Sequence, residues 1–349
     1  WIDELKFKAS IGSQGNDNIG SYRYTDTYDI VNSDGEVATS FSTKGNRDIT
    51  WETNTNFNAG IEFSLFNRVS GSIDYFSRKT TDMLFSFPVA PSLGYSSYYA
   101  NVGDMNNRGI EVELSVNIIN KKNFRWDVNG NLTYFKNKIT MLHDEKKTTR
   151  AYDMNGNLTE GYSSGSQFVG EGASLYSWYV REYAGVDPET GESLWYKIQW
   201  KTDEDGNEIK DENDHPIFDG VTTTKAYADA SQFINNKSGM APVYGGFGTS
   251  LELYGVDFSI NFSYQLGGWR YDSQYATFMA SAAGSNIGYN YHVDLLKSWT
   301  KENPNTDVPR FQYGDTYSAG TSTRFLTKAS YLNIENVNLG YTFPAKLTQ

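Results

Sequence analysis

Apolar and polar residues alternate along most of this chain, in runs of about ten residues. The clearest run is Val256–Leu266, where alternate positions read Val, Phe, Ile, Phe, Tyr, Leu on one side and Asp, Ser, Asn, Ser, Gln on the other. A period of two predicts a β-strand with one apolar and one polar face. Its length suits a tilted strand that crosses a bilayer, which needs about 9–11 residues. Strands of this kind are typical of a soluble β-sandwich or a membrane β-barrel.

The same alternation predicts ten strands. They cover approximately residues 5–11, 55–65, 69–79, 109–119, 124–137, 175–184, 192–199, 244–254, 256–266 and 331–343. The pattern is weakest in 175–184 and 192–199, where charged residues interrupt the apolar face. In the last strand the phase slips between Ile334 and Val337, which predicts a bulge near Glu335 and Asn336. Residues 272–300 are expected to be helical in part.

The connections between these strands alternate between short and long. Short turns are expected near residues 66, 121, 188 and 255, and long loops at about 13–50, 80–104, 138–174, 201–240 and 267–327. Outer-membrane barrels have this asymmetry, with short turns at one end and long loops at the other. Strands in packed sandwiches are usually shorter, about 5–6 residues in total. The pattern therefore favours a transmembrane antiparallel β-barrel over a sandwich.

Composition narrows the class further. The chain has 349 residues and a mean hydropathy of -0.58, and no stretch approaches the roughly 18 apolar residues of a transmembrane helix. This excludes a helical membrane protein but not a barrel, whose lumen face is polar. Aromatic residues make up 15% of the chain, enough to supply aromatic girdles at both membrane interfaces.

Charge and cysteine content exclude other classes. The net charge is -12 and no basic stripe is present, which argues against nucleic-acid binding. Because the chain has no cysteine, disulfide scaffolds and thiolate metal sites are excluded. The chain begins at Trp1, runs almost at once into a strand and stops soon after another. We interpret it as an internal piece of a longer polypeptide, whose location must be inferred from its pattern.

One segment resembles a known family. Residues 101–111 read NVGDMNNRGIE and match the pattern NxGxMxNxGxE of the SusC/RagA-type TonB-dependent outer-membrane transporters of Bacteroidetes. Further similar segments occur in the family's order over nearly the whole chain. They are the strand 5–12 with the following Gly15 and Asn16, Trp51 with Glu52, YAGVDPETG at 183–191, YGGFG at 244–248, and the final segment 329–341.

The resemblance implies a barrel of about 22 strands, an N-terminal plug, a TonB box and a SusD-like lipoprotein lid at the cell surface. Residues 1–349 would then be a partial TonB-dependent receptor β-barrel domain that supplies about ten strands from the C-terminal half. The plug and the TonB box lie outside this chain, and both edges of its sheet are expected to be open.

The same resemblance implies a function. It implies nutrient import through the bacterial outer membrane, powered by the TonB–ExbB–ExbD complex, with contacts to outer-membrane lipid and no enzymatic chemistry. An oligosaccharide is favoured over an oligopeptide as the substrate. Two alternatives stay open: a secreted or surface β-sandwich module that binds glycans, and a β-rich glycosidase, for which no carboxylate pair stands out.

Aromatic residues in the long loops are the candidate substrate contacts. Tyr95, Tyr98 and Tyr99 lie in one loop, and Trp269 and Tyr271 follow a strand. Flat rings stack on sugars or pack against peptides, while their polar tips form hydrogen bonds. Aromatic girdle residues and contacts with a lid protein are alternative roles.

Charged residues on the polar faces are candidates for the lumen of the barrel. Glu111 and Glu113 lie on one predicted strand, and Arg125 and Asp127 lie on its neighbour. If the apolar faces contact lipid, these four side chains face the interior.

No metal or cofactor is expected. Asp203 and Asp205 are weak candidates for Ca²⁺, which prefers oxygen ligands, but their spacing does not match an EF-hand. A solvated hairpin around them is the favoured interpretation. His143, His215 and His292 are scattered and form no zinc motif.

Overall fold

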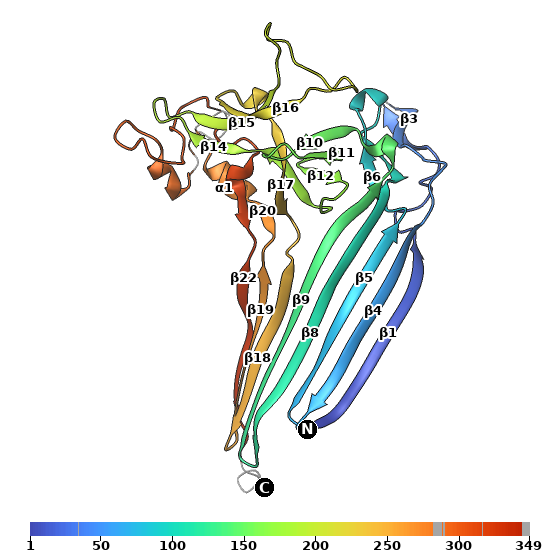
Figure 1. Cartoon of the computed structure of the whole chain (residues 1–349), viewed down its shortest axis with the longest axis vertical. Coiled ribbons are helices and arrows are strands. Elements are labelled where there is room, and N and C mark those ends of the chain that lie inside the picture. Colours follow the sequence, from blue (N-terminus) through green and yellow to red (C-terminus); the bar gives the residue numbers. More distant parts are fainter. Residues whose placement is uncertain (34, 282–287, 289, 316, 344–349) are drawn as a thin grey trace.

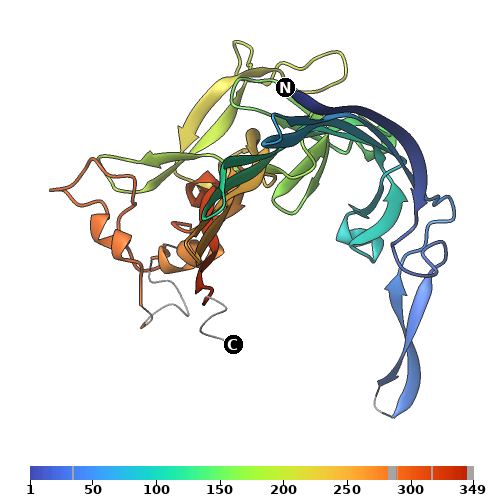
Figure 2. The ribbon, with the colours of Figure 1, turned by 90° about the horizontal axis from the view of Figure 1, so that it is seen from below.

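The computed structural model describes residues 1–33, 35–281, 288, 290–315 and 317–343. Its largest element is an antiparallel sheet of eight strands (Figure 1). The strands are β1 (Ile2–Asn16), β4 (Glu52–Leu65), β5 (Val69–Thr81), β8 (Gly103–Lys121), β9 (Phe124–Leu142), β18 (Val243–Leu253), β19 (Val256–Leu266) and β22 (Tyr331–Tyr341). They follow one another in the sheet in chain order. Seen from below, the sheet is an open arc whose edges are β1 and β22 (Figure 2).

Eight long strands replace the ten that the sequence predicts. The segments 175–184 and 192–199 do form strands, but in two small sheets away from the long one. Alternation reports one covered and one polar face, and it does not distinguish cover by lipid from cover by protein. In the segment 192–199, Trp195 and Ile198 are buried inside the protein. The predicted short turn near 188 is present, because β14 and β15 pair across it, but its predicted place at the turn end of the long sheet is wrong.

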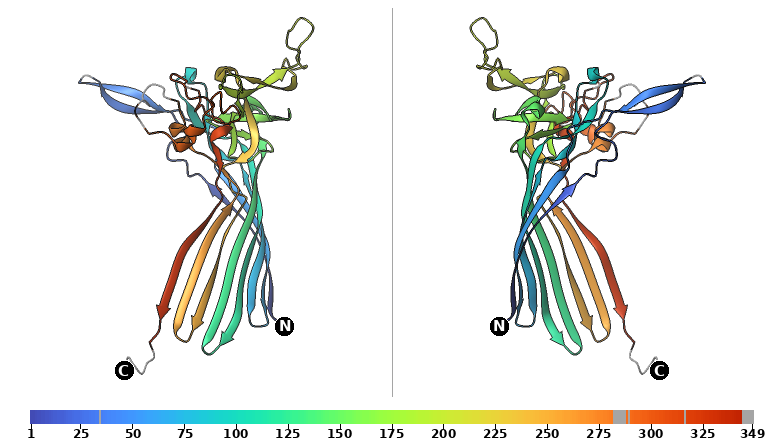
Figure 3. Two further views of the ribbon diagram at one scale, coloured as in Figure 1. Left: turned by 90° about the vertical axis from the view of Figure 1, so that its left-hand side faces the viewer. Right: turned by 90° about the vertical axis from the view of Figure 1, so that its right-hand side faces the viewer.

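The other three short turns are confirmed. They connect β4 to β5, β8 to β9, and β18 to β19, all at one end of the sheet (Figure 3). At the last of them, Tyr254 and Gly255 have φ values of 51° and 89°, the positive pair that a two-residue type I′ hairpin turn requires.

The four long connections lie together at the opposite end, and we call them the loop layer. They are residues 17–51, 82–102, 143–242 and 267–330. The two predicted loops 138–174 and 201–240 are parts of a single long connection, because the strands between them belong to the loop layer.

The loop layer has short elements of its own. They are β2 (Thr27–Ser33), β3 (Glu36–Thr43), β6 (Leu84–Pro88), η1 (Pro91–Leu93), β7 (Ser97–Asn101), η2 (Asp144–Lys146), β10 (Thr149–Tyr152), β11 (Leu158–Ser164), β12 (Gln167–Gly170), β13 (Ser177–Arg181), β14 (Tyr183–Val186), β15 (Ser193–Trp200), β16 (Phe218–Thr224), η3 (Tyr227–Asp229), β17 (Gln232–Ser238), β20 (Trp269–Tyr271), α1 (Ser273–Phe278), η5 (Val293–Lys297), η6 (Thr323–Phe325) and β21 (Leu326–Lys328). Helices α1 and η5 confirm the partly helical prediction for 272–300, of which 282–287 and 289 lie outside the described residues. No helix in the described part of the chain is both long and apolar enough to span a membrane.

The predicted bulge in β22 is confirmed. The pairing of β19 with β22 moves from Asn261–Asn336 to Phe262–Ile334, so that Glu335 is the extra residue.

The protein core lies in the loop layer and not on the long sheet. Among the described residues, the buried hydrophobic side chains belong to the loop layer or to the upper end of β9. The apolar face of the long sheet has no cover, and Phe7 and Leu339 are 73% and 76% exposed. A β-sandwich buries this face against a second sheet, so the sandwich alternative is wrong.

Candidate functional site

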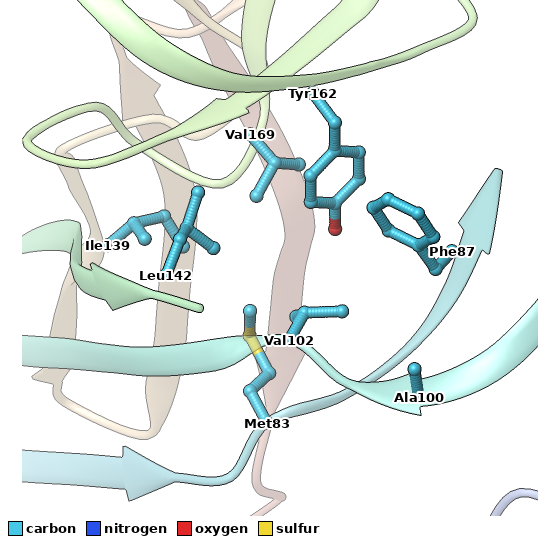
Figure 4. Close-up of a cluster of buried hydrophobic side chains, with 8 residues drawn as sticks. All are labelled: Met83, Phe87, Ala100, Val102, Ile139, Leu142, Tyr162 and Val169. Atoms are coloured by element: carbon cyan, nitrogen blue, oxygen red, sulfur yellow. The ribbon is translucent and has the colours of Figure 1, made fainter. Parts of the chain in front are cut away.

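A hydrophobic cluster joins the loop layer to the upper end of the long sheet (Figure 4). The Tyr162 ring packs edge-on against Phe87, with 4.9 Å between the ring centroids. Met83 and Val102 contribute from the loop 82–102, and Ile139 contributes from the end of β9. The cluster holds the loop 82–102 against the upper end of the long sheet. This loop carries three of the predicted tyrosines.

Those three tyrosines lie close together and are each partly buried. The Tyr95 and Tyr98 rings meet edge-on at 6.3 Å, and Phe41 from β3 approaches Tyr95 at 6.2 Å. Tyr99 has the guanidinium of Arg23 above its ring at 5.0 Å. The three tyrosines therefore form a cluster, and their role as substrate contacts stays a prediction.

A buried lysine holds Tyr98 in place. The Lys146 side chain is 7% exposed, and its Nζ donates a hydrogen bond to the Tyr98 hydroxyl at 2.8 Å. The same Nζ lies 4.7 Å from the centroid of the Phe87 ring, within the range of a cation–π contact. Glu145, 3.3 Å away, is its acidic partner and is itself largely exposed. No local sequence pattern indicates Lys146, because this residue comes from a different loop.

Tyr95 and Tyr98 line a hollow of about 720 Å³, which we call the tyrosine hollow. The loop 89–98 forms one side, and the base of the β2–β3 hairpin forms the other. Its remaining side chains with chemistry to offer are Tyr24, Asp26, Lys44 and Arg47. Asp26 accepts hydrogen bonds from the Gly45 N–H at 2.8 Å and from Lys44 Nζ at 3.1 Å, and both lower the pKa of its carboxyl.

Trp269 and Tyr271 have different surroundings. Trp269 lines a second hollow of about 590 Å³ at the point where β9 and β18 separate, together with Asn137, Asn157 and Ser238. The Lys237 ammonium lies 5.1 Å from the centroid of the Trp269 ring.

Tyr271 is instead part of the loop-layer core. It packs edge-on against the buried Phe325 at 6.1 Å, and burial raises the pKa of its hydroxyl. The structure therefore supports Trp269 as a surface that a ligand can contact more than it supports Tyr271.

The four predicted lumen charges lie on the polar set of positions but do not form one group. Glu111 is opposite Asp74 and Glu113 is opposite Ser72. Arg125 Nε contacts the Asp127 carboxylate at 2.8 Å.

A hairpin turn accounts for the weak calcium candidates. The Asp203 carboxylate accepts hydrogen bonds from the N–H groups of Asp205 and Asn207 at 3.0 and 2.8 Å. Thr202 pairs with Glu208 across the turn, as the hairpin interpretation predicts. Within the described ranges, no group of three or more His, Asp or Glu side chains is placed to hold a metal ion.

An ion cluster that the sequence did not indicate joins two of the long loops. Lys225 Nζ lies 2.6 Å from the Asp187 carboxylate and 3.0 Å from that of Glu192, and Arg310 contacts Glu192 at 3.1 Å. The hydrogen bond from Lys225, followed by that from the Glu189 N–H, lowers the pKa of Asp187 to about 2. The cluster fixes the turn 187–191 against the loop 267–330.

The architecture defines a class: a segment of a membrane β-barrel, with a lipid-facing apolar wall, short turns at one end and large folded loops at the other. Comparison with known proteins identifies the family. Residues 1–207 match the family model described as TonB dependent receptor-like, beta-barrel, and the chain belongs to this family. It is accordingly part of an outer-membrane protein.

Individual relatives agree over nearly the whole chain. TonB-dependent receptor P3 of Formosa agariphila is 26% identical over 368 residues, covering 98% of this chain and 33% of that protein. TonB-dependent receptor SusC of Bacteroides thetaiotaomicron is 26% identical over 356 residues, covering 98% and 32%. The RagAB peptide transporter structure matches with a TM-score of 0.81 and 30% identity, covering 99% of this chain and 35% of that one. The chain thus spans about a third of the relatives it matches.

Proposed function

We propose that this chain forms part of the barrel wall and the cell-surface loops of a TonB-dependent importer of the SusC/RagA type. The single observation that carries the proposal is a contrast within the structure. The apolar face of the long sheet is uncovered, whereas the loop layer at one end of the sheet has its own hydrophobic core. A wall of this kind needs lipid around it, and a loop layer of this kind is built to receive a ligand. The importer acts by binding and passage, not by covalent chemistry.

The substrate in this proposal is an oligosaccharide. Two hollows in the loop layer, the tyrosine hollow and the one beside Trp269, combine aromatic rings with amide, hydroxyl and charged groups. Aromatic faces that alternate with hydrogen-bonding groups suit the CH faces and hydroxyls of a sugar. An oligopeptide is the second candidate, because a solved structure similar to this chain is that of a peptide transporter.

The proposal includes partners. A SusD-like lipoprotein would cover the loop layer, the TonB–ExbB–ExbD complex would supply energy from the inner membrane, and outer-membrane lipid would contact the apolar wall. The similarity to SusC and to RagAB supports a shared arrangement.

Membrane fractionation of the full-length protein from its host tests the proposal. We expect an outer-membrane species that migrates differently on a gel after boiling, and cells lacking it should lose uptake of labelled oligosaccharides. Loss of oligopeptide uptake alone would favour the second candidate. A species that stays soluble without detergent, or unchanged uptake of both ligands, would contradict the proposal.

A further inference from the structure

We infer that the tyrosine hollow binds a carboxylate-bearing sugar, so that the imported oligosaccharide is an acidic one. The inference rests on the proposed function and gives its substrate a chemical class. It depends on which charges and hydrogen-bond donors in the hollow are already used by the protein and which are left for a ligand.

One acidic and two basic side chains line the hollow, so it has one excess positive charge. Asp26 forms an ion pair of 3.0 Å with Lys44, and the charge of Arg47 also lowers the pKa of Asp26, although the two side chains make no direct contact. Arg47 also lines the hollow, is exposed, and makes no hydrogen bond or ion pair with the described residues. A guanidinium binds a carboxylate through two parallel hydrogen bonds, so Arg47 is suited to an acid group on a ligand.

Tyr98 lines the hollow, and its hydroxyl has a proton to donate. An ammonium group can only donate, so in the contact with Lys146 the Tyr98 hydroxyl is the acceptor. The hydroxyl therefore keeps its own proton for another acceptor. The buried positive charge of Lys146, whose acidic partner Glu145 is exposed, also favours negative charge nearby. Lys146 acts here as a positioning residue.

The aromatic rings of the hollow indicate which groups the ligand has besides its carboxylate. Tyr24 and Tyr95 line the same hollow, and Tyr24 is 56% exposed. An aromatic face beside an arginine matches a sugar acid, which presents CH groups and a carboxylate together. A hollow of about 720 Å³ lies within the size range of ordinary ligand sites.

Binding measurements on the full-length protein in detergent test the inference. The probes are oligogalacturonate, a maltooligosaccharide of equal length, and an acidic oligopeptide. The variants are Arg47→Gln, which removes the guanidinium, and Tyr98→Phe, which keeps the ring and removes the donor. Lys201→Gln is the matched control, because it removes one exposed charge from the 201–208 hairpin, which does not line the hollow.

We expect oligogalacturonate to bind more tightly than the maltooligosaccharide, with an affinity that falls as salt is added. Arg47→Gln should weaken oligogalacturonate binding about tenfold or more, the usual effect of losing a charge-assisted hydrogen bond, and Tyr98→Phe about fivefold. Lys201→Gln should change it by less than about twofold.

Other results overturn the inference in distinguishable ways. If Arg47→Gln binds oligogalacturonate like the unmodified protein, the hollow is not the acid subsite, even if import of neutral sugars proceeds. If only the acidic peptide depends on Arg47, the ligand is not a sugar. If no oligomer binds and the protein is absent from the outer membrane, the proposed function fails as well.

Discussion

At the scale of single residues, the loop layer is held by contacts between segments that are far apart in the sequence. The Asp187 carboxylate is the clearest case, since Lys225 and the N–H groups of Glu189 and Thr190 bond to it. These contacts favour the charged form and lower its pKa to about 2, from 3.8. A depressed acid contributes stability above its unfolded pKa and loses it as the pH falls through the folded value. The turn 187–191 should therefore keep this stability above about pH 3.8 and lose it as the pH falls from about 3.8 to 2.

Replacing Lys225 by Met narrows that window. Without the ammonium, the pKa of Asp187 returns toward its ordinary value, so the turn 187–191 should already be looser at pH 4 and should lose less stability between pH 4 and 2 than in the unmodified protein. Pepsin cleavage of the full-length protein between pH 2 and 4 measures this. Lys201→Met is the control, and equal cleavage profiles for the two variants would contradict the assignment.

Tyr162 illustrates a residue whose ring and hydroxyl have opposite effects. Its side chain is 1% exposed, its hydroxyl has no hydrogen-bond partner in the described part of the chain, and burial raises its pKa. Removal of an unpaired buried hydroxyl is neutral or stabilising, so Tyr162→Phe should leave local stability unchanged or raise it by about 1 kcal/mol. Tyr162→Ala should cost about 3–5 kcal/mol, because it leaves a cavity beside Phe87. Hydrogen exchange at residues 83–102 measures the local stability of both variants. A loss of stability in Tyr162→Phe would mean that the hydroxyl has a hydrogen-bond partner and would contradict the prediction.

Sequence reasoning found the right loop at this scale but not the right contacts. Tyr95, Tyr98 and Tyr99 are close in sequence, so their gathering in one loop was predictable. Arg47 and Lys146 reach the same region from other loops, and no local pattern signals a meeting of that kind. Trp269 and Tyr271 look alike in sequence, yet one lines a hollow and the other packs in a core.

At the scale of elements, the strands that face lipid were predictable. β19 was predicted with its observed bounds, and the bulge at Glu335 appeared as a phase slip, because period and phase are local properties of the sequence. β13 and β15 were misplaced, since a strand covered by protein alternates in the same way as one covered by lipid. The error concerns location, and location depends on contacts that are distant in the sequence.

The two topologies make opposite predictions for residue 189. The ten-strand pattern places it at the short-turn end with residues 66 and 121, whereas the structure places it in the loop layer. The chain has no cysteine, so an introduced cysteine is the one thiol within residues 1–349 that a maleimide can label. We expect Glu189→Cys to react with a membrane-impermeant maleimide on intact cells, and Lys122→Cys to react only after the outer membrane is opened. Protection of residue 189 on intact cells would restore the ten-strand topology.

At the scale of the whole molecule, the two parts of the described structure suit different solvents. The loop layer has its own core and suits water, whereas the apolar face of the long sheet suits lipid. The edges β1 and β22 each leave a row of backbone hydrogen-bonding groups without a partner strand in the described structure. In hydrocarbon each unpaired group costs several kcal/mol, so a membrane barrel must close.

These open edges lead to a prediction about the chain by itself. Residues 1–349 produced alone and refolded in detergent should not give the form that shifts on boiling, because the open arc of eight strands leaves both edges unpaired. The full-length protein, refolded in parallel, is the control and should shift. Gel migration with and without boiling measures both. A shift for the isolated chain, at the size of one copy, would mean that β1 and β22 can pair and that the open arc is not the lowest-energy form.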